Sequence, residues 1–258
     1  RVRQMRYLIL IAVFVSGCAI APIFEPVFEP VFKPAPPPKL TPEIVARQFE
    51  AAAFDDGLGL ADPVLMRWTE PVKFFFLSES WGHALPYSID INRINKRIAE
   101  AAGTAVDVVL DFDQANLTVT LLPRRLFYQA IKRLRKKLPN AHQIAATNAC
   151  FAALSQKQKD GTIPAAAIVI ATDISEDDRR HCIPEKFYQI MGLPGDSCVY
   201  RPSLVCSQDT VLELQPADEL LLAVLYDNEL KPGMTKDEAL PLVLELIKKR
   251  WPEFIKDE

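Results

Sequence analysis

The segment 185–196 constrains the fold of this chain more than any other. It places Glu185 and Gln189 four residues apart, so that in a helix both side chains lie on one face. Gly192 follows three residues later, where a glycine allows the chain to turn away from a helix. Pro184 suits the first turn of a helix, because its missing N–H has no helical partner there. We therefore expect a helix that begins at Pro184 and carries oxygen-bearing side chains on one face.

The same segment resembles the active-site helix of metzincin zinc proteases, whose pattern is His-Glu-x-x-His-x-x-Gly-x-x-His. When the two are aligned on Gly192, Glu185 and Gln189 stand at the two helical histidines. Lys186 stands at the general-base glutamate, and Gly195 stands at the third histidine. The resemblance implies an α/β (α+β) domain with a zincin-like fold, a mixed sheet packed on helices, in which the metal-ligand motif has been lost.

The residue types at these positions argue against catalysis. Zinc sites of this kind use imidazole nitrogens, whereas Glu185 and Gln189 offer oxygens, which suit calcium or magnesium better. Lys186 cannot deprotonate a metal-bound water as a glutamate would. We expect no catalytic residue, no metal and no cofactor, and we expect Glu185 and Gln189 to hydrogen-bond inside a filled former site.

Histidines elsewhere in the chain do not restore a zinc site. His83 and His142 are isolated in the sequence. His181 lies four residues before Glu185, but Pro184 predicts that the helix starts after it.

Further motifs extend the resemblance. Ser203-Leu204-Val205 stands where metzincins have their methionine turn. Over roughly residues 65–250 the chain resembles a bacterial group, domain-of-unknown-function family 2927. Its pattern is a cysteine, then Glu-Glu-x-x-Gln-x-x-Gly-Leu-x-Asn-Asp, and later Leu-Tyr-Asp-Pro-x-Leu-x-Pro-Gly-Met. The matching positions are Cys182, Glu185, Gln189, Gly192, Leu193, Asp196, Leu225, Tyr226, Asp227, Leu230, Pro232, Gly233 and Met234, and the departures are Lys186, Gly195 and Asn228. The resemblance implies a secreted or lipid-anchored protein and no established activity.

The N-terminal residues are typical of a bacterial lipoprotein signal peptide. Three arginines precede the apolar run 7–15, which is too short to span a bilayer. The run ends in Val15-Ser16-Gly17-Cys18, which looks like a lipobox. We expect residues 1–17 to be removed and acyl chains on Cys18 to anchor the protein. By resemblance to sorted lipoproteins, Ala19 favours the periplasmic face of the outer membrane. The alternative is a hydrophobic tail with a chance cysteine.

Four cysteines remain once Cys18 is lipidated. An even number in an oxidising compartment favours two disulfides, and three pairings exist. We favour Cys198–Cys206, a short local loop, and Cys150–Cys182, which would tie the start of the key helix to an earlier segment. Four free thiols are the alternative. Zinc binding is disfavoured, because no two cysteines have a C-x2-C spacing.

Residues 18–41 form the lipid anchor and a proline-rich linker, which favours extended backbone. The linker contains a four-residue repeat, Phe-Glu-Pro-Val, over residues 24–34. This phenylalanine-bearing strip either docks on a partner or on the protein's own domain, or it is a degenerate spacer. Both alternatives stay open.

Residues 42–258 read as one α/β domain. Apolar spacing predicts helices, and β-prone apolar runs predict strands. Expected helices are 42–54, 91–102, 124–138, one from Pro184, 216–226 and 236–251, and expected strands are 72–77, 106–112, 117–122 and 165–171. A turn is expected at 114–116. Thr235 and Glu238 predict a capping box for the last helix, which Pro241 should kink.

These features favour a non-catalytic cell-envelope protein that binds a protein or peptide partner in a degenerate protease-like cleft, beside the strand 165–171. One alternative is a hydrolase that uses Glu185, Gln189 and Asp196 around a hard cation. Another is a structural or assembly factor that acts through its linker.

The charge of the chain does not favour nucleic-acid binding. With a net charge of −3, the protein has no overall positive field that would attract a nucleic acid. The basic helix 124–138 reads as a solvated face, with anionic lipid or another polyanion as the alternative.

Overall fold

The structure is a computed structural model that describes residues 39–55, 64–78, 81–155, 160–209 and 211–256. The chain divides into two units, Arg1–Pro36 and Pro37–Glu258, and every element described below belongs to the second. The expected signal peptide, the lipidation site Cys18 and the Phe-Glu-Pro-Val repeat all lie outside the described residues. Within the described residues, no helix has the length and apolar character needed to cross a membrane.

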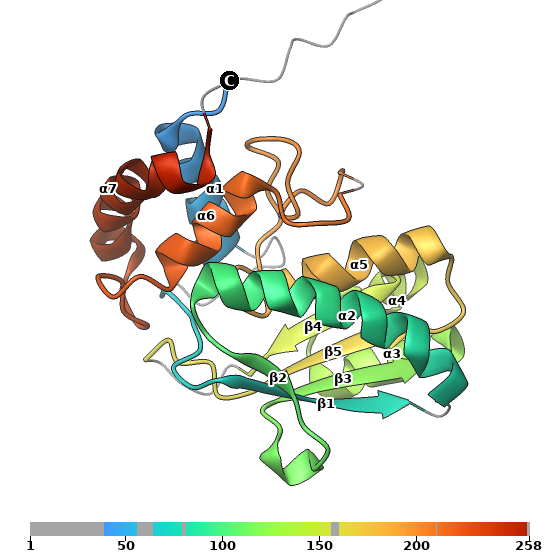
Figure 1. The fold of residues 1–258 in the computed structure, drawn as a ribbon. Helices are drawn as coiled ribbons and strands as arrows, with labels where there is room; N and C mark the ends of the chain where they lie inside the picture. The colour runs from blue at the N-terminus through green and yellow to red at the C-terminus, as the bar shows by residue number, and fades with distance from the viewer. Residues whose placement is uncertain (1–38, 56–63, 79–80, 156–159, 210, 257–258) are drawn as a thin grey trace, which may run out of the picture. The chain divides into compact units, whose positions relative to one another are not determined.

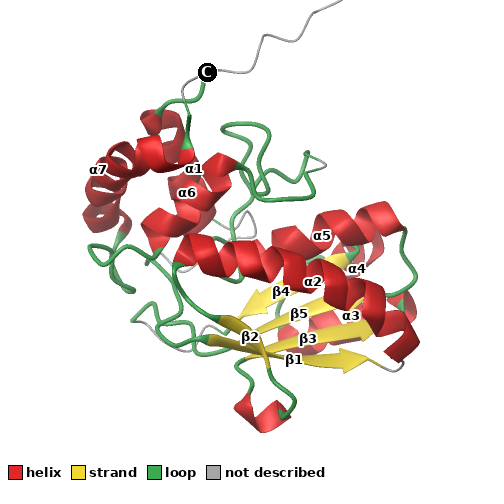
Figure 2. Ribbon diagram, viewed as in Figure 1, coloured by secondary structure: helices red, strands yellow, loops and turns green. Residues whose placement is uncertain are grey.

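A five-stranded mixed sheet is the centre of the domain (Figure 2). The strand order is β2-β1-β3-β5-β4, in which β4 is antiparallel to β5 and every other neighbouring pair is parallel. The strands are β1 (Val72–Ser78), β2 (Val106–Val108), β3 (Leu117–Leu122), β4 (Cys150–Leu154) and β5 (Ala166–Ala171). Among the described residues, the two edge strands of the sheet are therefore β2 and β4.

Helices cover both faces of the sheet and add a helical layer beside it. In Figure 1, α2 and α5 lie over one face, α3 and α4 lie over the other, and α1, α6 and α7 gather together at one end of the sheet. The helices are α1 (Pro42–Phe54), α2 (Trp81–Ala102), α3 (Arg124–Leu134), α4 (Ala141–Thr147), α5 (Glu176–Gln189), α6 (Pro216–Leu225) and α7 (Lys236–Phe254), with a 3-10 turn η1 (Phe112–Gln114).

The core follows the alternation of side chains along the strands. On β5, Ile168 and Ile170 belong to the large core under α2 and α5. Val169 and Ala171 belong to a smaller core, in which Phe127 and Ile131 of α3 are fully buried. Both faces of the sheet are thus buried at β5, as expected for a central strand of a mostly parallel sheet between two helical layers.

Many elements agree with the sequence. The α/β class, the helices α1, α6 and α7, and the strands β1, β3 and β5 lie where their patterns predicted them, within a few residues. Thr235 and Glu238 form the expected capping box. Pro241 lies inside α7.

Three helix predictions were wrong at their ends. α2 begins ten residues before the expected position 91, with Pro86 inside it, because one proline in an early turn removes a single hydrogen bond. α5 begins at Glu176, not at Pro184. α3 ends at Leu134 rather than at 138, and the residues up to Pro139 form turns.

The sheet differs from the sequence prediction in two ways. Neither α4 nor β4 was predicted, although β4 completes the sheet. The expected turn at 114–116 does not join neighbouring strands, because β1 lies between β2 and β3 and pairs with both. β2 is also only three residues long, shorter than the predicted strand 106–112.

Candidate functional site

α5 carries the residues that the sequence singled out. Ser175 caps its N-terminus, where the Oγ accepts a hydrogen bond from the Asp178 N–H at 3.0 Å. Three acidic residues in the first turn complement the helix dipole. This strong start outweighs Pro184, whose ring costs one hydrogen bond inside the helix.

A disulfide joins α5 to the sheet edge. Cys182 of α5 is bonded to Cys150 of β4, and Cys198 is bonded to Cys206 in the loop that follows α5. These are the two pairings that the sequence favoured. Glu185 and Gln189 follow Cys182 by three and seven residues, so they lie on the stripe of α5 that faces β4.

Glu185, Lys186 and Gln189 form a small polar cluster on this stripe. The Glu185 Oε1 accepts a hydrogen bond from the Lys186 ammonium at 2.7 Å and from the Gln189 Nε2 at 3.1 Å. The side chains of Glu185 and Lys186 are only 13% and 12% exposed. The carboxylate is therefore already paired with a cation, and Gln189 presents its amide nitrogen to it. The described residues contain no group of three or more His, Cys, Asp or Glu side chains that could hold a metal ion.

Asp196 takes no part in this cluster. It is exposed, and its Oδ1 accepts a hydrogen bond from the Ser207 N–H at 2.8 Å. Asp196, which the sequence grouped with Glu185 and Gln189 around a hard cation, thus stabilises the loop closed by Cys198–Cys206.

Gly195, which the sequence resemblance aligned with the third metzincin histidine, has no room for a side chain. The Gly195 N–H donates to the Ala52 carbonyl of α1 at 2.8 Å. A Cβ at Gly195 would overlap the backbone carbonyl oxygens of Ala51 and Asp55. The C-terminal turn of α1 therefore fills the space that a third ligand would need.

The histidines are placed elsewhere or differently. His181 lies inside α5, contrary to the prediction, but its Nδ1 is 3.1 Å from the Val211 carbonyl oxygen. His142 stacks on Tyr128, with ring centroids 3.6 Å apart. The side chain of His83 lies outside the described residues.

A buried polar network behind the cluster was not predicted. Asp218 is fully buried, and its carboxylate accepts hydrogen bonds from Ser203, Tyr200 and the N–H groups of Leu204 and Gln215. Burial raises the pKa of Asp218 despite these donors. Gln48 of α1, also fully buried, binds Ser197 and Val199. The hydrogen bonds of Asp218 and Gln48 thus connect α6 and α1 to the loop between α5 and α6.

Residues 42–245 match the model of one protein family, described as "Protein of unknown function (DUF2927)". The chain belongs to this family. The match covers most of the chain and includes α1, which the expected range 65–250 did not. No curated protein and no solved structure is significantly similar to the chain.

The structure explains several of the matched DUF2927 positions. The Tyr226 hydroxyl donates to the Met191 carbonyl at 3.0 Å, which joins the end of α6 to the end of α5. Gly233 has φ +86° and donates its N–H to the Leu65 carbonyl, while Met234 accepts from the Leu65 N–H. These positions hold the segment at residues 64–68 in place. They point to a shared fold rather than to shared chemistry.

β4 is the sheet edge nearest to the cluster of this DUF2927 protein. Ser155 donates to the Ala165 carbonyl, and Ala149 accepts from the Ala171 N–H, so the odd-numbered residues face β5. The backbone groups of Cys150, Ala152 and Leu154 therefore point outward, and within the described residues they have no hydrogen-bond partner. β5 itself lies between β3 and β4. β5, beside which the peptide was expected to bind, is therefore not an edge strand, because β4 pairs with its outer side.

Proposed function

We propose that this DUF2927 protein is a non-catalytic, lipid-anchored protein of the cell envelope that binds an extended peptide segment of a protein partner. The peptide adds as a sixth strand along the outer edge of β4. Main-chain hydrogen bonds supply affinity in such complexes, and pockets for alternate side chains supply selectivity. The sequence resemblance had located the peptide beside residues 165–171, and the proposal moves it one strand outward.

The free edge of β4 is the observation that carries this proposal. Natural proteins protect exposed edges with charged residues, prolines, bulges or covering segments. The five residues of β4 include neither a charge nor a proline, and the outward groups of Ala152 and Leu154 have no described partner. The Cys150–Cys182 disulfide holds this edge beside the polar cluster on α5. A peptide paired with β4 would therefore lie close enough to contact Glu185 and Gln189 of α5.

The order of the elements supports a zincin-like origin for the scaffold. β5 leads into α5, whose Glu185 and Gln189 stand at the metzincin ligand positions, and Gly192 turns the chain with φ +114°. Glu185 pairs with Lys186. This pairing favours binding over hydrolysis, because the carboxylate already has its cation.

The envelope location rests on the sequence and on the disulfides. The lipobox ending in Cys18 lies outside the described residues. Two disulfides are typical of proteins in oxidising compartments. Both features agree with an anchored protein that faces the periplasm.

A proline at the edge tests the proposal. Ala152→Pro removes the outward N–H of β4 without removing any bond to β5, because edge positions tolerate proline when their N–H faces outward. Peptides selected from a random heptapeptide display library would be titrated calorimetrically against the full chain. We expect Ala152→Pro to weaken their binding about tenfold or more while the protein stays folded.

Leu110→Pro is the control, because it places a proline at an exposed position in the loop after β2, away from the β4 edge. It should leave the affinity of these peptides unchanged. Hydrogen exchange should show new protection of Ala152 and Leu154 when peptide is bound. Equal affinity for wild type and Ala152→Pro would contradict the proposal. The proposal would also be contradicted if Ala152→Pro weakened only the self-association of the protein. In that case a second copy of the chain, and not a partner peptide, would occupy the β4 edge.

A further inference from the structure

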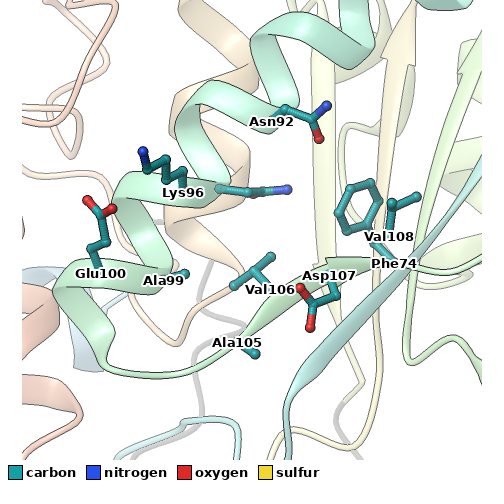
Figure 3. Close-up of a pocket in the computed structure, with 10 residues that line it drawn as sticks. Phe74, Asn92, Lys96, Ala99, Glu100, Ala105, Val106, Asp107 and Val108 are labelled. Atoms are coloured by element: carbon teal, nitrogen blue, oxygen red, sulfur yellow. The ribbon is translucent and has the colours of Figure 1, made fainter.

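A second unpaired region lies at the opposite edge of the sheet. A cavity of about 380 Å³ opens between α2 and the strands β1 and β2. Figure 3 shows Asn92, Lys96 and Glu100 along α2 on one side, and Val106, Asp107 and Val108 of β2 on the other. Phe74 of β1 forms an apolar wall, is 4% exposed and packs edge-on against Phe187. The size is at the lower end for pockets that hold small ligands.

Asn95 is the most unusual residue of this cavity. It is 3% exposed and lines the cavity, and neither its Oδ1 nor its Nδ2 has a hydrogen-bond partner among the described residues. A buried amide with no partner is costly, and most buried polar side chains are satisfied. An apolar side chain at this position would avoid that cost. The arrangement is therefore expected where an outside group pairs with the amide.

The rim of the cavity is also unpaired. Asn92, Lys96, Glu100 and Asp107 are exposed, and their side chains form no hydrogen bond or ion pair with any described residue. Lys96 and Glu100 are four residues apart on α2, yet they do not pair. Both donors and acceptors are thus available around one opening, and the charges are mixed. A strongly charged ligand of one sign would not suit this rim.

The wall of the cavity adds backbone groups. β2 pairs with β1 through Ala105 and Val109, whose bonds to Val72 and Phe74 leave the N–H and C=O groups of Val106 and Val108 facing away from β1. An extended peptide residue presents its own N–H and C=O on one edge, spaced to pair with a strand edge or with a side-chain amide. Asn95 and the β2 edge therefore offer two matching recognition elements in one place.

We propose that this cavity binds a short extended peptide segment of two or three residues, with one residue of the segment paired to both polar atoms of the Asn95 amide. The Asn95 Nδ2 donates to the carbonyl of that residue, and the Asn95 Oδ1 accepts its N–H. Phe74 and Val106 contact the neighbouring aliphatic side chains. This site is independent of the β4 edge, which lies at the other end of the strand order.

Nuclear magnetic resonance on the ¹⁵N-labelled full chain tests the site with a defined probe, the blocked tripeptide N-acetyl-Ala-Ala-Ala-amide. We expect the probe to shift the side-chain amide resonances of Asn95. The same peptide with its central nitrogen methylated should bind about tenfold more weakly or worse, because it lacks the N–H that Oδ1 accepts. No shift at Asn95, or equal binding of both peptides, would overturn the proposal.

Asn95→Leu separates a binding role from a structural one. If the amide serves an outside ligand, replacing it with an apolar side chain of similar size should abolish probe binding and leave the thermal midpoint equal or higher. Asn228→Leu, at an exposed position without a described partner, should change neither property. A marked loss of stability in Asn95→Leu would overturn the proposal, because it would mean that internal water satisfies the amide. Retained binding in Asn95→Leu would overturn it too, by locating the probe elsewhere.

Discussion

Gly192 and Gly195 occupy two positions in the connection after α5 where a side chain has no room. Gly192 has φ +114°, and a Cβ there would overlap the Met66 carbonyl. Gly195 needs no unusual φ, yet its Cα faces the carbonyls of Ala51 and Asp55. These close backbone contacts fasten α5 to the segment 64–68 and to α1. Glycine at both positions therefore allows the segment 64–68 and α1 to pack closely against the connection after α5.

Gly195→Ala should destabilise the protein strongly. The added methyl meets backbone atoms that cannot rotate away, so we expect a loss of about 3 kcal/mol in the free energy of unfolding. Urea denaturation followed by circular dichroism measures this loss. Gly103→Ala is the control, because a Cβ at Gly103 meets nothing within 4 Å and only its positive φ of 62° is strained, at about 1 kcal/mol. Equal losses for the two variants would mean that α1 does not pack against Gly195.

At the scale of elements, charged side chains fasten the ends of the C-terminal helices. The Arg67 Nη1 donates to the carbonyls of Leu225 and Asp227 at 3.0 and 2.9 Å, at the C-terminus of α6. The Arg250 guanidinium of α7 pairs with the Asp227 carboxylate at 2.7 Å. Burial alone would raise the pKa of Asp227, but the Glu229 N–H and Arg250 together lower it below its ordinary value.

This pairing predicts a pH-dependent contribution from Arg250. Because the pKa of Asp227 is lower in the folded state, its contribution is present above the unfolded pKa of about 3.9 and is lost as the pH falls through the folded value. Arg250→Met should lower the free energy of unfolding by about 1 kcal/mol at pH 7, and the difference from wild type should shrink below about pH 4.

Urea titrations over this pH range measure the difference. Lys248→Met, also on α7, removes a 3.9 Å pair with Glu43 of α1, in which both side chains are exposed, and should change stability by only a few tenths of a kcal/mol at any pH. If the difference in the free energy of unfolding between wild type and Arg250→Met stays constant down to about pH 2, then Arg250 does not act through Asp227.

At the scale of the whole domain, the two disulfides differ in what they connect. Cys150–Cys182 spans 32 residues and joins the sheet edge to α5, whereas Cys198–Cys206 spans 8 residues within one loop. A cross-link lowers the entropy of the unfolded chain more when the closed loop is longer. The first bond therefore stabilises the domain, and the second mainly shapes the loop that Asp196 braces.

Removing the disulfides one at a time should separate these roles. Cys150→Ala with Cys182→Ala should cost about 4 kcal/mol in the free energy of unfolding, and Cys198→Ala with Cys206→Ala about 2.5 kcal/mol. Guanidinium denaturation under non-reducing conditions measures both losses. The reverse order would mean that the local loop contributes more to the core than its length suggests.

The sequence by itself determined the features that depend on local chemistry. Apolar spacing located α1, α6, α7 and three strands, the capping box at Thr235 follows from residue types alone, and the cysteine count favoured two disulfides. The motif around Glu185 also identified the family, because the matched residues lie close together along the chain.

Only the tertiary structure decided the arrangement of the candidate sites. β4 is a short apolar segment that becomes a strand through pairing with β5, so its own sequence carries little signal. Whether Pro184 begins α5 or lies inside it depends on the cap at Ser175 and on packing against the sheet. Asn95 looks like an ordinary polar residue of an amphipathic helix until the fold buries it. Burial and pairing between distant segments are properties of the packed chain, and no local pattern encodes them.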